Sequence, residues 1–114
     1  MKYVRITIEP TADFQSLTPI LIDAIIDDAN NIVGVHPLFG VQGDPERRRS
    51  GERFEPFVLD VTGLLDWGDG FDPTNDRYGK LDLHNRPVAI GRILTLNYGA
   101  RPEQYRIVQI TTLL

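Results

Sequence analysis

Alternating apolar and polar positions open the chain and predict a half-buried strand. Val4, Ile6 and Ile8 fall on one face of the segment 2–9, and the residues between them are mostly polar. A period of two residues is the spacing of side chains that point to one face of a strand. Pro10 follows and predicts the end of this strand, because proline lacks the amide hydrogen that a central ladder needs.

A second apolar segment, 19–29, fits the period of a helix. Thr18 and Pro19 are residue types that favour the N-cap and the first helical position. Spacings of three and four then predict an apolar stripe along one face of an amphipathic helix. The stripe consists of Ile22, Ile25, Ile26 and Ala29, with Leu21 at its edge.

Two strand-like runs, 88–98 and 105–114, close the chain. Both alternate apolar and polar positions, and the residues between them include glycine and proline, so they predict an antiparallel hairpin. Gly91 predicts a bend or bulge in the first run. The second run stays apolar up to Leu114, although chain ends are usually frayed. This last strand is therefore expected either to pair inside the sheet or to be covered by a partner.

The middle of the chain combines one short strand with long irregular stretches. The segment 57–61 predicts a strand that ends in a turn at Thr62 and Gly63. Residues 31–53 and 66–85 are rich in turn formers and predict surface loops. Together the elements predict an α+β fold, in which one amphipathic helix packs on an antiparallel or mixed sheet that can curl into a small barrel.

The length of 114 residues fits one domain, 1–114, because domains typically have roughly 100 to 150 residues. A hydrophobic content of 41% and a charged content of 25% are typical of globular chains. The chain contains no cysteine. This excludes thiolate nucleophiles, disulfides and cysteine-ligated metals.

The formal net charge of −4 argues against a nucleic-acid-binding surface, because nonspecific affinity for phosphates comes mainly from lysine and arginine. No apolar run approaches the roughly 18 residues that a membrane-spanning helix needs. The first nine residues also lack the continuous apolar core of a signal peptide. We therefore expect a soluble cytoplasmic protein that makes no membrane contact.

The segment 66–84 is rich in aspartate and aromatic residues and is the best candidate for chemistry. Its carboxylates could supply the oxygen ligands of Ca²⁺ or Mg²⁺, although their spacing does not match an EF-hand. Aspartates among glycines also commonly bond neighbouring amides in turns, which is the favoured alternative. The candidate metal ligands are Asp66, Asp69, Asp72 and Asp76.

Trp67, Phe71 and Tyr78 lie in the same segment. Their rings could form a stacking platform for a ligand or anchor a partner protein. The alternative is that they plug into the core and hold the loop in place.

Arg47, Arg48 and Arg49 form the densest positive cluster. Guanidinium groups match phosphate and carboxylate oxygens well, so the cluster is a candidate contact for an anion or an acidic partner. Glu46 and Glu52 flank it and weaken its field, which favours a solvated loop.

Signatures of common catalytic mechanisms are missing. Either His36 or His84 could serve as a base, but the sequence has neither a nucleophile elbow nor a phosphate-binding glycine loop. We expect no cofactor. The first hypothesis is a noncatalytic interaction or assembly module, which binds a protein partner or self-associates. The alternative is a small enzyme, or a ligand- or metal-binding protein, that uses the segment 66–84.

Overall fold

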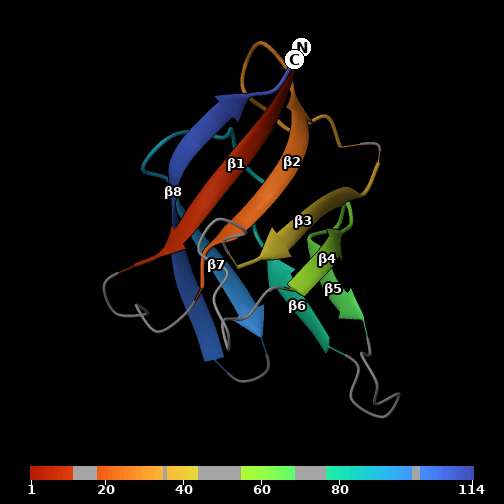
Figure 1. Ribbon diagram of the computed structural model, residues 1–114, viewed down its shortest axis with the longest axis vertical. Coiled ribbons are helices and arrows are strands. Elements are labelled where there is room, and N and C mark those ends of the chain that lie inside the picture. Colours follow the sequence, from red (N-terminus) through yellow and green to blue (C-terminus); the bar gives the residue numbers. More distant parts are fainter. Residues whose placement is uncertain (12–17, 35, 44–54, 69–76, 99–100) are drawn as a thin grey trace.

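The computed structural model describes residues 1–11, 18–34, 36–43, 55–68, 77–98 and 101–114. In these parts of the chain, eight antiparallel strands close into one barrel in chain order (Figure 1). Because β8 returns to pair with β1, none of these strands is left with an open edge. The strands are β1 (Lys2–Pro10), β2 (Ile20–Ile26), β3 (Leu38–Gln42), β4 (Glu55–Leu59), β5 (Leu64–Gly68), β6 (Arg77–Leu81), β7 (Ile93–Tyr98) and β8 (Arg101–Thr112).

The α+β prediction is wrong, because the described residues contain no helix and the fold is all-β. Strand β2 occupies the segment for which a helix was predicted. Its buried residues are Ile20, Ile22, Ala24 and Ile26, which also follow a period of two. A short apolar run thus satisfies both periods, and pairing with β1 and β3 selects the strand. Isoleucine favours this outcome, because its branched side chain suits a pleated surface.

A turn takes the place of the second half of the predicted helix. The amide of Asn30 donates to the carbonyl of Asp27 at 3.0 Å, and the Asp27 carboxylate accepts from the amides of Ala29 and Asn31, both at 2.9 Å. Asn30 adopts a left-handed φ of 64°, which asparagine tolerates in turns. The short polar side chains after Ile26 therefore end the strand in a compact turn.

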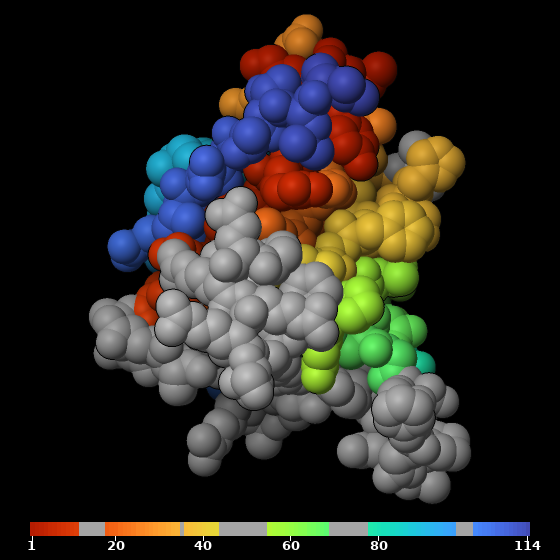
Figure 2. Space-filling view, viewed as in Figure 1, coloured from red at the N-terminus to blue at the C-terminus, as the bar shows by residue number. Residues whose placement is uncertain are grey.

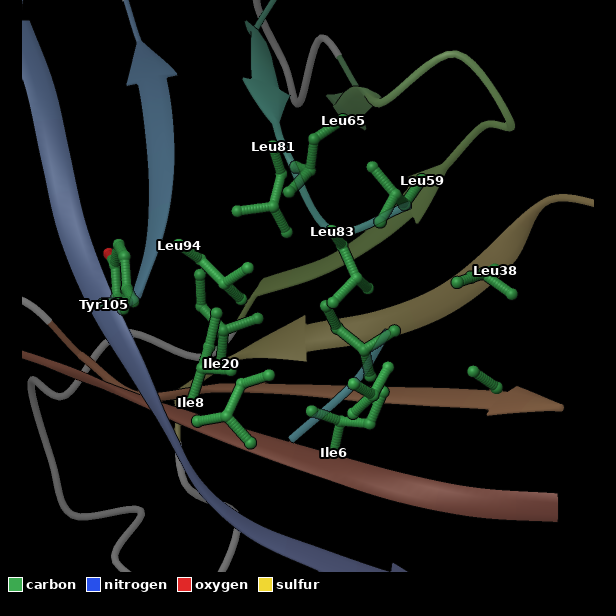
Figure 3. Close-up of a cluster of buried hydrophobic side chains, with 14 of the residues drawn as sticks. Ile6, Ile8, Ile20, Leu38, Leu59, Leu65, Leu81, Leu83, Leu94 and Tyr105 are labelled. Carbon is green, nitrogen blue, oxygen red and sulfur yellow. The ribbon is translucent and has the colours of Figure 1, made fainter. Parts of the chain in front are cut away.

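The interior of the barrel is one apolar core. Figure 3 shows side chains from strands on opposite sides of the barrel directed into the same space, Ile6 and Ile8 among them. Side chains of β1 and β8, near the two ends of the chain, belong to this same core. The largest fully buried side chains are Tyr105, Ile6, Ile8, Ile20, Ile22, Leu59, Leu65, Leu81, Leu83, Leu94, Leu96 and Ile107.

The hairpin at the end of the chain is confirmed as β7 and β8, although β7 begins only at Ile93. Strand β8 pairs with β1 on its other side, and the amide of Leu113 donates to the carbonyl of Tyr3 at 2.8 Å. The apolar C-terminal strand is therefore covered within the chain itself. Gly63 has a φ of +92°, which confirms the turn predicted there. Gly91 has the same φ but lies in a turn before β7, so the bend predicted inside a strand is instead the place where the strand has not yet begun.

Among the described residues, no helix has the length and apolar character needed to cross a membrane.

Candidate functional site

A single cross-strand row of outward-facing side chains runs across six of the eight strands of the barrel. Strand register places one residue from each of six successive strands directly opposite the next. Directly opposed Cβ atoms lie about 4.5 to 5.5 Å apart, so neighbours in the row are within reach of each other. The row consists of Arg5, Asp23, Phe39, Val58, Asp66 and Tyr78.

Phe39 is the most exposed apolar residue of this row, although phenylalanine side chains are usually buried. Its side chain is 68% exposed, and Figure 2 shows the β3 residues (gold) projecting from the flank of the barrel. Further apolar side chains surround it on β1, β2, β3 and β4. We call this surface the Phe39 face and define it as Tyr3, Leu21, Ile25, Phe39, Val41, Pro56 and Val58.

Three surface hollows adjoin Phe39, and Phe39 contributes to the lining of each. The first has a volume of about 390 Å³ and includes Arg5 and Leu21. The second, about 260 Å³, is lined mainly by apolar residues such as Tyr3 and Ile25, together with Asp23 and His36, and we call it the Tyr3 hollow. The third, about 320 Å³, includes Trp67. Phe39 is thus a protruding ring with a concave surface on each side.

One ion pair lies within the Phe39 face, because Asp23 stands between Leu21 and Ile25 on β2 and directly opposite Phe39. The guanidinium of Arg5 donates two hydrogen bonds to the carboxylate of Asp23, at 2.8 and 3.0 Å. The hydrogen bond and the charge of Asp23 raise the pKa of Arg5 above its ordinary value. Since the two charges neutralise each other, this part of the surface is close to neutral on a chain with a net charge of −4.

The structure brings part of the aspartate- and aromatic-rich segment next to this face. Trp67 is partly buried against the core, and a Cβ added to Gly79 would lie 3.1 Å from its ring. Tyr78 is 46% exposed and lies opposite Asp66. Trp67 therefore combines packing with a place in the third hollow, whereas Phe71 lies outside the described residues.

The metal prediction can be followed only at Asp66, whose carboxylate accepts from the amide of Gly68 at 2.7 Å. This is the turn-type bond that the alternative hypothesis expected. Among the described residues, no three histidine or acidic side chains are grouped closely enough to hold a metal ion. The remaining candidates lie outside the described residues, namely Asp69, Asp72, Asp76 and the cluster of Arg47, Arg48 and Arg49.

A more polar pocket of about 370 Å³ lies over β6 and β7, with Lys80 and Asp82 in its lining. The Asp82 carboxylate accepts from the amide of Thr95 at 2.8 Å. Arg92 stabilises the connection between β6 and β7, because its guanidinium donates to the backbone carbonyls of Leu83 and Arg86, at 3.0 and 2.8 Å. Asp82 and Arg92 therefore hold the backbone in place.

His84 lines the same pocket, but both of its ring nitrogens are buried and have no hydrogen-bond partner among the described residues. Burial lowers the pKa of His84 below its ordinary value, and the charge of Asp60 opposes this effect only in part. The ring is therefore neutral at neutral pH. A catalytic base must reach the proton that it removes, and buried nitrogens do not offer that access.

His36, the other candidate base, is exposed and lines the Tyr3 hollow. The sequence interpretation missed Phe39 altogether, because it placed residues 31–53 in a loop. The available signal was the short apolar run from Leu38 to Val41. Comparisons with protein-family models, curated proteins and solved structures found no match to this chain.

Proposed function

We propose that this chain is a noncatalytic protein-binding module and that the Phe39 face is its docking surface. The observation that carries the proposal is the 68% exposure of Phe39 at the centre of an apolar surface. Single exposed apolar residues are common, but contiguous apolar patches on a soluble domain mark interaction sites. Full burial of one phenylalanine side chain contributes about 1.5 to 3 kcal/mol.

The composition of the surface supports the same function. Cores of protein interfaces are rich in aromatic residues and poor in charge, with polar groups at the rim. Phe39 and Tyr3 supply the rings. Within the described residues, the charged side chains of this region are Asp66, which lies opposite Val58, and the paired Arg5 and Asp23. The ion pair is satisfied before docking, so its burial leaves neither group without a partner.

The closed barrel restricts how a partner is recognised. A peptide often binds a sheet by adding a strand to an open edge. Here each of β1 to β8 already pairs with two neighbours. Recognition therefore depends on side chains on the outside of the barrel, and the hollows beside Phe39 are suited to apolar side chains of the partner.

A site-specific photo-crosslink tests this proposal. A photoreactive benzophenone amino acid replaces Phe39, and a matched protein carries it at Ile90, which is 62% exposed and belongs to the connection between β6 and β7. We expect a discrete protein adduct in native cells from position 39 and none from position 90. Equal labelling at both positions, or no adduct at position 39, would contradict the proposal.

A further inference from the structure

We infer that the occupant of the Phe39 face is a second copy of this chain, with Phe39 of each copy inserted into the Tyr3 hollow of the other. The inference rests on the proposed function, since it uses the same surface. It adds the identity of the partner and the geometry of docking.

Self-complementarity is the first argument. A two-fold dimer buries the same surface patch on both subunits, so that patch must contain both a projection and a matching concavity. Phe39 projects from the surface and also forms one wall of the Tyr3 hollow. Because the ring and the hollow are adjacent, one two-fold axis between them allows both insertions at once.

The size and lining of the hollow are the second argument. Its volume is about 260 Å³, whereas an apolar cavity of about 150 Å³ suffices to bind benzene in another protein. Tyr3, Ile25, Val33 and Pro37 supply apolar walls. The hollow therefore has both the room and the surface to hold a phenyl ring.

Charge is the third argument. Two copies that each carry a net charge of −4 repel one another over most of their surface. Arg5 neutralises Asp23 beside Phe39, so this face allows approach with little repulsion.

Sedimentation equilibrium over about 1 µM to about 1 mM measures the association. We expect the wild-type chain to form dimers, and Phe39→Ser to weaken them roughly hundredfold or more, because two ring burials are lost. Ile25→Arg should weaken them to a similar extent by filling both hollows. Ile90→Ser removes an equally exposed apolar side chain elsewhere and should leave the dimer unchanged.

A mixture of the two variants tests the docking geometry. The Phe39→Ser copy loses the Phe39 wall of its hollow but keeps the walls of Tyr3, Ile25, Val33 and Pro37. The Ile25→Arg copy keeps its Phe39 ring, so one of the two insertions can form between them. We expect this heterodimer to bind at least about tenfold more tightly than either variant binds itself. Thermal melting verifies that both variants fold, and Tyr3→Arg replaces Ile25→Arg if the latter does not.

Two results would overturn the inference. The first is a wild-type chain that stays monomeric over the whole range, and the second is a mixture no tighter than the separate variants. If position 39 nevertheless crosslinks to a different protein, the dimer is wrong and the proposed function stands. If position 39 yields no adduct, the proposed function fails as well.

Discussion

Gly40 lies under the ring of Phe57, its direct neighbour across the β3–β4 ladder. A Cβ at position 40 would stand 2.5 Å from the Phe57 ring and 2.5 Å from the carbonyl oxygen of Leu21. Since real Cβ atoms do not approach so closely, the missing side chain at Gly40 lets β3 keep its place beside β2 and β4. The strand that presents Phe39 thus depends on this glycine.

Gly40→Ala should therefore destabilise the barrel by about 2 kcal/mol or more. The added methyl group would have to displace the backbone at Leu21 as well as the side chain of Phe57. Gly34→Ala is the matched control, since its added Cβ would meet only ordinary contacts at 3.9 Å. Urea unfolding of both variants measures the difference in free energy of unfolding. Equal stabilities would show that the contact at Gly40 is not restrictive.

Arg92→Met should destabilise the fold by about 3 kcal/mol, because it removes charge-assisted hydrogen bonds to several backbone carbonyls. In addition to the carbonyls of Leu83 and Arg86, two further oxygens accept hydrogen bonds from the guanidinium. They are the backbone carbonyl of Asp82 and, at 2.8 Å, the side-chain oxygen of Asn85. Arg86→Met, at an exposed position, should change stability by less than about 0.5 kcal/mol. Chemical denaturation of the two variants gives the comparison, and similar losses would argue against the role assigned to Arg92.

The Arg5–Asp23 pair should contribute little to stability, because both side chains are partly exposed. A double-mutant cycle with Arg5→Met and Asp23→Asn should give a coupling free energy of about 0.2 to 1 kcal/mol. The same two substitutions should have a larger effect on self-association, where the pair is removed from water. A coupling well above this range in the monomer would mean that the pair mainly stabilises the barrel.

Stability should depend on pH through His84. Its pKa is lowered in the folded state, so the unfolded chain, with a histidine pKa of about 6.5, binds the proton more readily. The contribution of neutral His84 to the free energy of unfolding is therefore fully present above about pH 6.5. It declines as the pH falls from there through the lowered pKa of the folded state.

Melting temperatures between about pH 8 and about pH 5 measure this effect. The decline on acidification should be smaller for His84→Gln than for wild type, whereas His36→Gln, at an exposed position, should follow wild type. A wild-type profile unchanged by His84→Gln would show that this imidazole is not the titrating group.

Parts of the fold were predictable because their patterns were unambiguous. Val4, Ile6 and Ile8 alternate over a long enough stretch to define a strand face, and the final hairpin has the same property. The local sequence does not decide the structure of the run from Ile20 to Ile26. The spacing of four between Ile22 and Ile26 fits one face of a helix, and the spacing of two between Ile20 and Ile22 fits one face of a strand. Pairing of β2 with β1 and β3 selects the strand.

The candidate site was harder to predict for a related reason. Asp66, Trp67 and Tyr78 were singled out from composition. Cross-strand register places Asp66 and Tyr78 in the same row as Phe39, and Trp67 lines the third hollow with it. Phe39 itself stood in a stretch too short to show a period, between His36-Pro37 and Gly43. Its importance arises from exposure and from neighbours on β2 and β4, neither of which the local sequence contains.

Hydroxyl-radical footprinting of the Phe39 ring tests the docking surface most directly. The account predicts heavy oxidation of Phe39 in the dilute monomer and strong protection of Phe39 and Tyr3 at high concentration, with Ile90 oxidised equally in both. Equal oxidation of Phe39 in the dilute protein, in the concentrated protein and in native cells would contradict the claim that this face binds a protein.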